Sequence, residues 1–307
     1  MVRKVKFKAK FKAKFKNRID GDWAYSAAVH IMLAIVLAVI IYPFVFTVST
    51  SLSASERLLK EGNVFFLPKG FTMDGYIALL NMKGIPRFYA NTVLYAISGT
   101  ALMLAVCCLT AYPLSVRRLP GKKAFLLMIT VTLFFNGGLI PTYLQIVNMG
   151  MLDTFWAFIV PGAINAWNVI IFKTFFQQLP VELSDAAYMD GANEFVIFRK
   201  VILPLSAPII ATFAVFGLVA FWNDWFTPLI YFNSEKLQPM QLFLRKMLVN
   251  LEVRSIHSMS ATLAAELIDS RPSRSAAVVI TVLPIACIYP FFQKHFTKGI
   301  LVGSLKG

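Results

Sequence analysis

The sequence contains little charge, and acidic residues are the scarcest charged type. Only 15% of its 307 residues are charged, and 15 Asp and Glu stand against 30 Lys and Arg. The mean hydropathy is +0.67, whereas a soluble domain of this length needs far more polar surface to cover its core. This composition argues against a large soluble core and predicts a polytopic membrane protein.

Residues that carry redox, metal or nucleophilic chemistry are also scarce. The three cysteines, Cys107, Cys108 and Cys287, lie inside apolar runs without CxxC spacing, which favours packing over redox or metal roles. The three histidines are scattered, and no pair has the spacing of a metal site. The phosphate-binding pattern G-x-x-x-x-G-K-[ST] does not occur, so we do not expect the chain to hydrolyse ATP alone. We expect no catalytic residue, metal or cofactor on this chain.

Apolar runs of about 20 residues match the thickness of the bilayer core, and helices satisfy their backbone groups internally. We therefore predict an all-α membrane protein with a basic arm at 1–22 and one transmembrane domain at 23–307. A local break is expected in the third span, at Asn136-Gly137-Gly138. The six expected spans cover about 25–48, 91–115, 124–147, 155–176, 205–232 and 276–292.

The distribution of Lys and Arg predicts the orientation of these spans. Basic residues concentrate in the arm, in the loop after the second span, after the fourth span and in the tail, while 148–154 has none. Because cytoplasmic loops are rich in Lys and Arg, both termini are predicted to be cytoplasmic. Phe7, Phe11 and Phe15 recur among the lysines of the arm. The arm is therefore either a simple positive-inside anchor or a helix on the anionic inner leaflet. Topology accounts for most of the +15 charge, so nucleic-acid binding is not expected.

A charged, helix-prone segment at 180–204 interrupts the apolar runs on the predicted cytoplasmic side. Glu182 and Asp185 lie in a first turn, where the helix dipole favours acidic groups. Gly191 permits a backbone turn that other residues resist. A second short helix is expected to follow, with Phe195 and Phe198 spaced to share a face. The predicted shape is helix, glycine corner, helix, which presents a rigid projection to the cytoplasm.

This segment resembles the EAA loop of ABC-importer permeases: Glu-Ala-Ala, three residues, Gly, nine residues, Ile, one residue, Leu-Pro. Asp185-Ala186-Ala187, Gly191, Val201 and Leu203-Pro204 fall at those spacings. Asp185 replaces the glutamate and Val201 the isoleucine, and both changes are conservative. Resemblance to the carbohydrate branch, and within it to maltose-type second permeases and the complex-glycan sub-branch, rests on Asp190-Gly191-Ala192, Trp222-Asn223-Asp224-Trp225, 136–141 and the ending 289–307.

The resemblance implies a type I ABC-importer permease fold in a bacterial cell membrane. Such a permease pairs with a homologous permease above two ATPase subunits, which hold ATP and Mg. An extracytoplasmic solute-binding protein delivers the oligosaccharide. The 180–204 segment would be the coupling helix that docks in an ATPase cleft and carries ATP-driven motion to the membrane helices. The residues implied in coupling are Asp185, Ala186, Ala187, Met189, Asp190, Gly191, Phe195, Phe198, Leu203 and Pro204.

Polar and aromatic residues at membrane depth are candidates for sugar contacts, because sugars are held by hydrogen bonds and by stacking. For the cluster that includes Asp224, an interfacial aromatic belt with a structural Asn–Asp pair fits equally well. The maltose-type resemblance places most sugar contacts on the other permease. The candidates for a substrate pathway are Asn136, Asn165, Trp167, Asn168, Trp222, Asn223 and Asp224.

Two other functions fit the sequence less well. A self-sufficient secondary sugar transporter would usually have repeats and discontinuous helices in matched halves, and the sequence indicates neither. A membrane-embedded enzyme would need acid, base or metal groups that converge at one depth, and the histidines are too dispersed for that.

Overall fold

The computed structural model describes residues 2–62, 64, 66–82, 84–116, 118–257 and 271–304. Within these ranges the regular structure is helical, apart from one isolated bridge between Ser53 and Phe71. The chain divides into two compact units. The first contains Met1–Tyr76 and Ser270–Ala276, and the second contains Ile77–Asp269 and Ala277–Gly307.

The first unit is built on the long helix α1, Val2–Ser51, which is followed by α2, Ser55–Glu61. Within α1, Tyr25–Ser51 is long and apolar enough to cross a membrane. Hydroxyl groups fix its C-terminal end: Ser49 Oγ donates to Phe66 O at 2.6 Å, and Ser51 Oγ lies 2.7 Å from Tyr76 Oη. The side chains of residues 1–22 lie outside the described part, so the expected Phe and Lys pattern of the arm stays a prediction.

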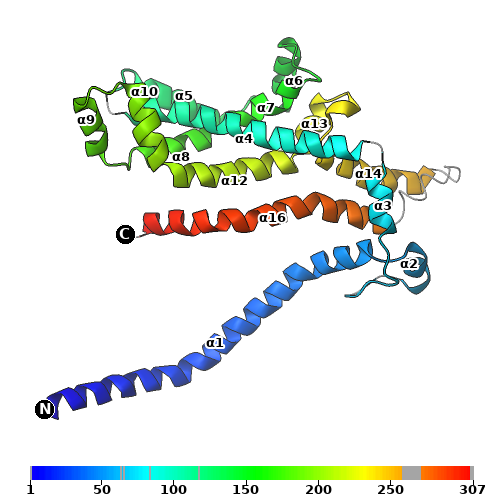
Figure 1. The fold of residues 1–307 in the computed structure, drawn as a ribbon, viewed down its shortest axis with the longest axis horizontal. Helices are drawn as coiled ribbons and strands as arrows, with labels where there is room; N and C mark the ends of the chain where they lie inside the picture. Colours follow the sequence, from blue (N-terminus) through cyan, green and yellow to red (C-terminus); the bar gives the residue numbers. More distant parts are fainter. Residues whose placement is uncertain are drawn as a thin grey trace. The chain divides into compact units, whose positions relative to one another are not determined.

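The second unit is organised around α4, Ile85–Ser115. Helix α3, Asp74–Leu80, leads into it from the first unit. Residues of α4 share two buried clusters with the helices around it, and Figure 1 shows α12 running alongside α4. Further helices are α5 (Lys122–Phe134), α6 (Leu139–Asn148), α7 (Phe155–Ala163), α8 (Ala166–Phe176), α12 (Ala207–Asn223), α13 (Phe226–Tyr231), η2 (Glu235–Leu237), α14 (Met240–His257) and α16 (Arg271–Ser304).

The contact between α4, α7 and α12 depends on glycine. The ring of Phe221 in α12 is 6% exposed. A methyl group at Gly99 would lie 2.6 Å from this ring, and one at Gly162 would lie 2.8 Å from it. On the other side of the contact, a methyl group at Gly217 would meet Thr100 at 2.9 Å. Small residues allow membrane helices to approach closely, so these glycines set the spacing of the bundle.

Bends divide two of the predicted spans, and a third bend lies where the fifth predicted span begins; only the bend in the third span was expected. The third span divides into α5 and α6, bent by 117°, and the fourth into α7 and α8, bent by 48°. The helical run Glu194–Leu205 meets α12 at 76°. The break in the third span falls at residues 135–138, as predicted. In the described part of the chain, two helices are long and apolar enough to span alone, and up to five spans result if each bent pair counts as one.

Two further boundaries differ from prediction. Helix α4 begins at Ile85, six residues before the predicted second span, because Gly84 and Pro86 start a helix there. The fifth predicted span ends as a helix at Asn223, and α13 follows after Asp224 and Trp225. The sixth predicted span lies within α16.

Candidate functional site

The predicted projection consists of α9, Val181–Met189, a glycine corner and the short helix α10, Glu194–Ile197. Gly191 has φ +79°. Its N–H donates to Tyr188 O, and Ala192 N–H donates to Ala187 O, both at 3.0 Å. These are the two hydrogen bonds of a Schellman cap, with Gly191 at the left-handed position. The predicted helix, glycine corner and helix are therefore present, and the corner has a specific hydrogen-bonded form.

The two arms of this projection are attached to the bundle very differently. Helix α9 buries no side chain. After α10 the chain forms a π-helical turn, Phe198–Ile202, and the short helix α11, Leu203–Leu205. Ile197, Phe198 and Ile202 all belong to the buried cluster beneath α4 and α8. Since π-helical turns are rare and frequent at functional sites, this junction into α12 is a candidate point of movement. Figure 1 shows α9 and α10 at one end of the bundle and α14 at the other.

Exposed apolar side chains gather on the projection. Met189 is 88% exposed and Phe195 is 64% exposed. Val181, Leu183 and Tyr188 are exposed too. Met, with its flexible thioether, suits an adaptable contact surface. We call these five residues the projection surface. Phe195 and Phe198 lie three residues apart in one right-handed helical run, but they do not form one exposed face. Phe195 is exposed, whereas the ring of Phe198 is buried against Tyr112, with 5.0 Å between the ring centroids.

One carboxylate joins α9, α10 and α4. Tyr112 Oη donates to Glu194 Oε2 at 2.6 Å, and Tyr188 Oη donates to Glu194 Oε1. The hydrogen bond to Glu194, followed by desolvation, raises the pKa of Tyr188 to about 12. Tyr188 therefore stays protonated and able to donate throughout the neutral range. Sequence reasoning missed this contact, because Tyr112 and Glu194 are 82 residues apart.

The side chains of Trp222, Asn223 and Asp224 are held by interactions within the fold. Trp222 is buried, and its Nε1 donates to Thr281 O of α16 at 3.1 Å. Asn223 Oδ1 accepts from Gln241 Nε2 at 3.2 Å. Asp224 Oδ1 accepts from the N–H groups of Phe226 and Thr227, both at 3.0 Å, at the start of α13. The three side chains thus make structural contacts, but not the expected Asn–Asp pair, and a direct sugar contact stays a prediction.

The other predicted pathway residues lie at the helix breaks. Asn136 Oδ1 accepts from Gly138 N–H at 2.9 Å between α5 and α6. Asn165 Oδ1 caps α8 by accepting from Asn168 N–H at 3.2 Å. Asn168 Nδ2 lies 3.5 Å from Met103 Sδ, and Trp167 is exposed. Asn136 and Asn165 thus act in forming the bends, which leaves Trp167 as the most accessible ring in this set.

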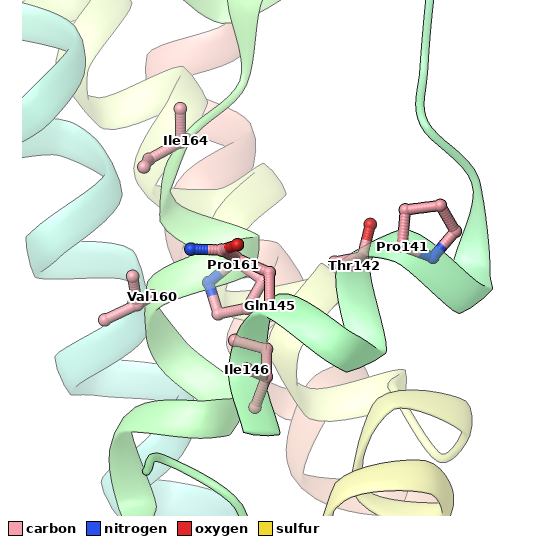
Figure 2. Close-up of a pocket in the computed structure, with 7 residues that line it drawn as sticks. All are labelled: Pro141, Thr142, Gln145, Ile146, Val160, Pro161 and Ile164. Carbon is pink, nitrogen blue, oxygen red and sulfur yellow. The ribbon is translucent and has the colours of Figure 1, made fainter. Parts of the chain in front are cut away.

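An open pocket of about 350 Å³ lies between α6 and α7, beside the two breaks. Its lining is mostly apolar, and Thr142 and Gln145 supply the polar side chains (Figure 2). Neither residue was predicted from sequence; their spacing of three on one helix was the available signal. The lining residues are Pro141, Thr142, Gln145, Ile146, Val160, Pro161 and Ile164.

Comparison with known proteins matches this arrangement to transport components. The family described as "Binding-protein-dependent transport system inner membrane component" matches residues 75–302. Protein LplC of Bacillus subtilis is 40% identical over 274 residues, which cover 88% of this chain and 90% of LplC. The polygalacturonan/rhamnogalacturonan transport system permease protein YtcP of the same organism is 35% identical over 267 residues, 87% of this chain and 93% of YtcP.

A solved structure is similar along nearly its whole length. It is the crystal structure of a bacterial ABC transporter involved in the import of the acidic polysaccharide alginate. The matched chain has a TM-score of 0.81 and 30% sequence identity, and the match covers 90% of this chain and 98% of that one. The helical architecture and the sequence family therefore agree.

Proposed function

Because the chain belongs to the family of binding-protein-dependent transport system inner membrane components, we propose that it is one permease of an ABC importer for oligosaccharides. It is a transport component and not an enzyme. In this proposal a homologous permease lies beside it, two ATPase subunits bind ATP and Mg below it, and a solute-binding protein delivers the sugar outside. The proposed location is a bacterial cell membrane.

The projection surface supports the coupling role. An ATPase cleft would receive α9, and the Schellman corner would keep α9 in a fixed direction relative to α10. An exposed group of Met and aromatic side chains in a water-facing segment is typical of a protein contact. The π-helical turn, which is anchored by buried Phe198 and Ile202, and Pro204 then join this contact to α12. Closure of the ATPases would thus move α12 and, with it, the membrane bundle.

Placing a charge on the apolar projection surface tests whether this surface docks on the ATPase. Met189→Glu and Phe195→Glu are each expected to lower ATPase binding about tenfold or more, because a charge would be desolvated at the contact. Leu59→Glu is the matched control, since Leu59 of α2 is 82% exposed outside the projection. Pull-down of the ATPase by the tagged permease measures the effect. Equal binding by all three variants would contradict the docking role.

The proposed topology has six spans with both termini in the cytoplasm. Helix α16 supplies the sixth span, and each bent pair supplies one. The distribution of basic residues supports this orientation. It places the projection in the cytoplasm and α14 on the outside, at opposite ends of the bundle in Figure 1.

The proposed cargo is an oligosaccharide, and an acidic one is the first to test. The relative YtcP is named for polygalacturonan and rhamnogalacturonan, and the solved relative for alginate. Uptake of oligogalacturonides and of alginate oligosaccharides, by the complete transporter with its binding protein, tests this directly. If neither acidic oligosaccharide is taken up but neutral oligosaccharides are, the cargo is not acidic, and the proposal of an oligosaccharide importer still holds.

Asp224 distinguishes a capping role from a sugar contact. Asn caps a helix as well as Asp, whereas Ala loses the cap and costs about 1 kcal/mol. We therefore expect Asp224→Asn to transport like the wild type, and Asp224→Ala to lower thermal stability. A large loss of transport in Asp224→Asn, with unchanged stability, would instead assign Asp224 to the sugar pathway.

A self-sufficient secondary transporter is the alternative. Discontinuous helices are present in α5–α6, where the sequence predicted a break, and in α7–α8, where it did not, so that part of the argument against the alternative fails. The family match and the projection surface still favour an ABC importer. Isolation of the tagged chain with a second permease and an ATPase would support the importer.

A further inference from the structure

Helix α9 has a weak attachment to the bundle for a segment that must transmit force. It buries no side chain. Ala187 alone among its apolar residues packs against the buried cluster, together with Ala192 beyond the corner. Two alanine side chains bury little apolar surface. Because burial contributes about 25 cal/mol per Å², they stabilise the position of α9 only weakly. The backbone of the glycine corner and the hydrogen bonds around Glu194 must therefore supply the rest.

Glu194 is well placed to strengthen the attachment of α9 to the bundle. It is the first residue of α10, and Asn193 caps that helix by accepting from Val196 N–H at 2.9 Å. A carboxylate in the first turn is favoured by the helix dipole. Its two oxygens accept from two different phenols, Tyr188 of α9 and Tyr112 of α4. Hydrogen bonds to an ionised acceptor are about twice as strong as neutral ones.

Tyr112 connects this carboxylate to the membrane bundle. It lies one turn from the C-terminal end of α4, and its ring packs on Phe198 at the start of the π-helical turn. The phenol of Tyr112 thus contacts α10 and its ring contacts the start of the π-helical turn, while Glu194 extends the connection to α9 through Tyr188. A displacement of α9 reaches α12 through the backbone, and the Glu194 bridge adds a direct path from α9 to α4 beside the packing of α12 on α4.

We propose that Glu194 is a positioning residue for coupling, whose carboxylate clamps α9 to the cytoplasmic end of α4 through Tyr188 and Tyr112. The clamp makes α4 and α12 respond together when the ATPases move α9. This inference rests on the proposed function, because it assigns the path by which docking at the projection surface reaches a second membrane helix.

The test follows the distance between α9 and α4 in the complete transporter. Spin labels are attached at Glu182→Cys and Ser115→Cys in a Cys287→Ser background; Cys107 and Cys108 are buried. Distances are measured without nucleotide and after trapping with ATP, Mg and vanadate, so no sugar is needed. Variants are Glu194→Leu, Tyr112→Phe and their combination. Tyr143→Phe is the control, since its hydroxyl has no hydrogen bond to any residue that the structure describes.

With the clamp intact, we expect one narrow distance distribution that survives trapping. Glu194→Leu should raise the population with α9 away from α4 about threefold to tenfold, while ATPase pull-down stays normal. Tyr112→Phe should also raise the population with α9 away from α4. In the Glu194→Leu background it should add nothing, because the Tyr112 hydroxyl acts through Glu194. Tyr143→Phe should leave the distribution unchanged.

Three results would overturn the clamp: an unchanged distribution in Glu194→Leu, full additivity of Tyr112→Phe in that background, or loss of ATPase binding in Glu194→Leu alone. The third would make Glu194 part of the docking contact itself. If the wild-type chain binds no ATPase, the proposed function fails instead, and this outcome is separate from the other three.

Discussion

Gly191→Val is expected to uncouple ATP hydrolysis from transport while the protein still inserts and folds. Gly191 has φ +79° with open space around its Cα. The loss therefore comes from backbone conformation and not from a clash. An L-residue in the left-handed region costs about 1–2 kcal/mol, and a β-branched one is a genuine outlier there. The Schellman cap should open, and α9 should lose its direction relative to α10.

The measurement is sugar transported per ATP hydrolysed, which we expect to fall about tenfold or more for a corner destabilised by this amount. Gly191→Asn is the rescue variant, since Asn tolerates the left-handed region, and it should retain most of the coupling. Gly150→Val is the matched control: Gly150 has φ +66° and equally open space, but lies outside the projection. Normal coupling in Gly191→Val would show that the corner is an ordinary loop.

Gly99→Ala is expected to have the largest effect on folding. The new methyl group would lie 2.6–2.8 Å from the far edge of the Phe221 ring. That ring cannot swing away freely, because it is 6% exposed, Gly162 faces it and Phe158 packs edge-on at 5.8 Å. Overpacking of this kind costs about 1–3 kcal/mol. The yield of folded protein and its thermal stability in detergent should both fall.

A second substitution makes this test specific. Phe221→Leu removes the ring atoms that the methyl group would meet, so Gly99→Ala should cost much less in the Phe221→Leu background. Gly137→Ala is the control, since its methyl group would meet only Pro141 Cβ, at 3.6 Å. Equal costs of Gly99→Ala in both backgrounds would mean that the close approach of α4 and α12 does not determine stability.

The projection could be predicted from sequence because its determinants are local. Pro180, the small residues of 185–187 and Gly191 fix two helices and a corner within residues 180–197. The same spacing placed Phe195 and Phe198 on one face, but the sequence did not show that the bundle buries Phe198 against Tyr112 and leaves Phe195 exposed. The Glu194 bridge could not be predicted, since Tyr112 comes from a distant part of the chain and only the packed bundle brings it close.

The breaks in the spans show a second limit of prediction from the sequence. Asn136-Gly137-Gly138 predicted one bend correctly. Asn165 and Asp224 were interpreted as possible sugar contacts, although a short Asn or Asp before a helix is also a capping signal. At these positions the side chain accepts backbone N–H groups and ends one helix while starting another. In a hydropathy profile such residues are only polar positions inside a span, and the profile does not predict the bend.

We propose that this chain transports only as part of an ATP-driven complex. Uptake of oligogalacturonides and alginate oligosaccharides into proteoliposomes, with the chain alone or with its co-purified permease and ATPase, tests it most directly. We predict uptake only by the complete assembly, dependent on ATP and the binding protein, and abolished by Met189→Glu. Uptake by the isolated chain, driven by an ion gradient without ATP, would contradict it.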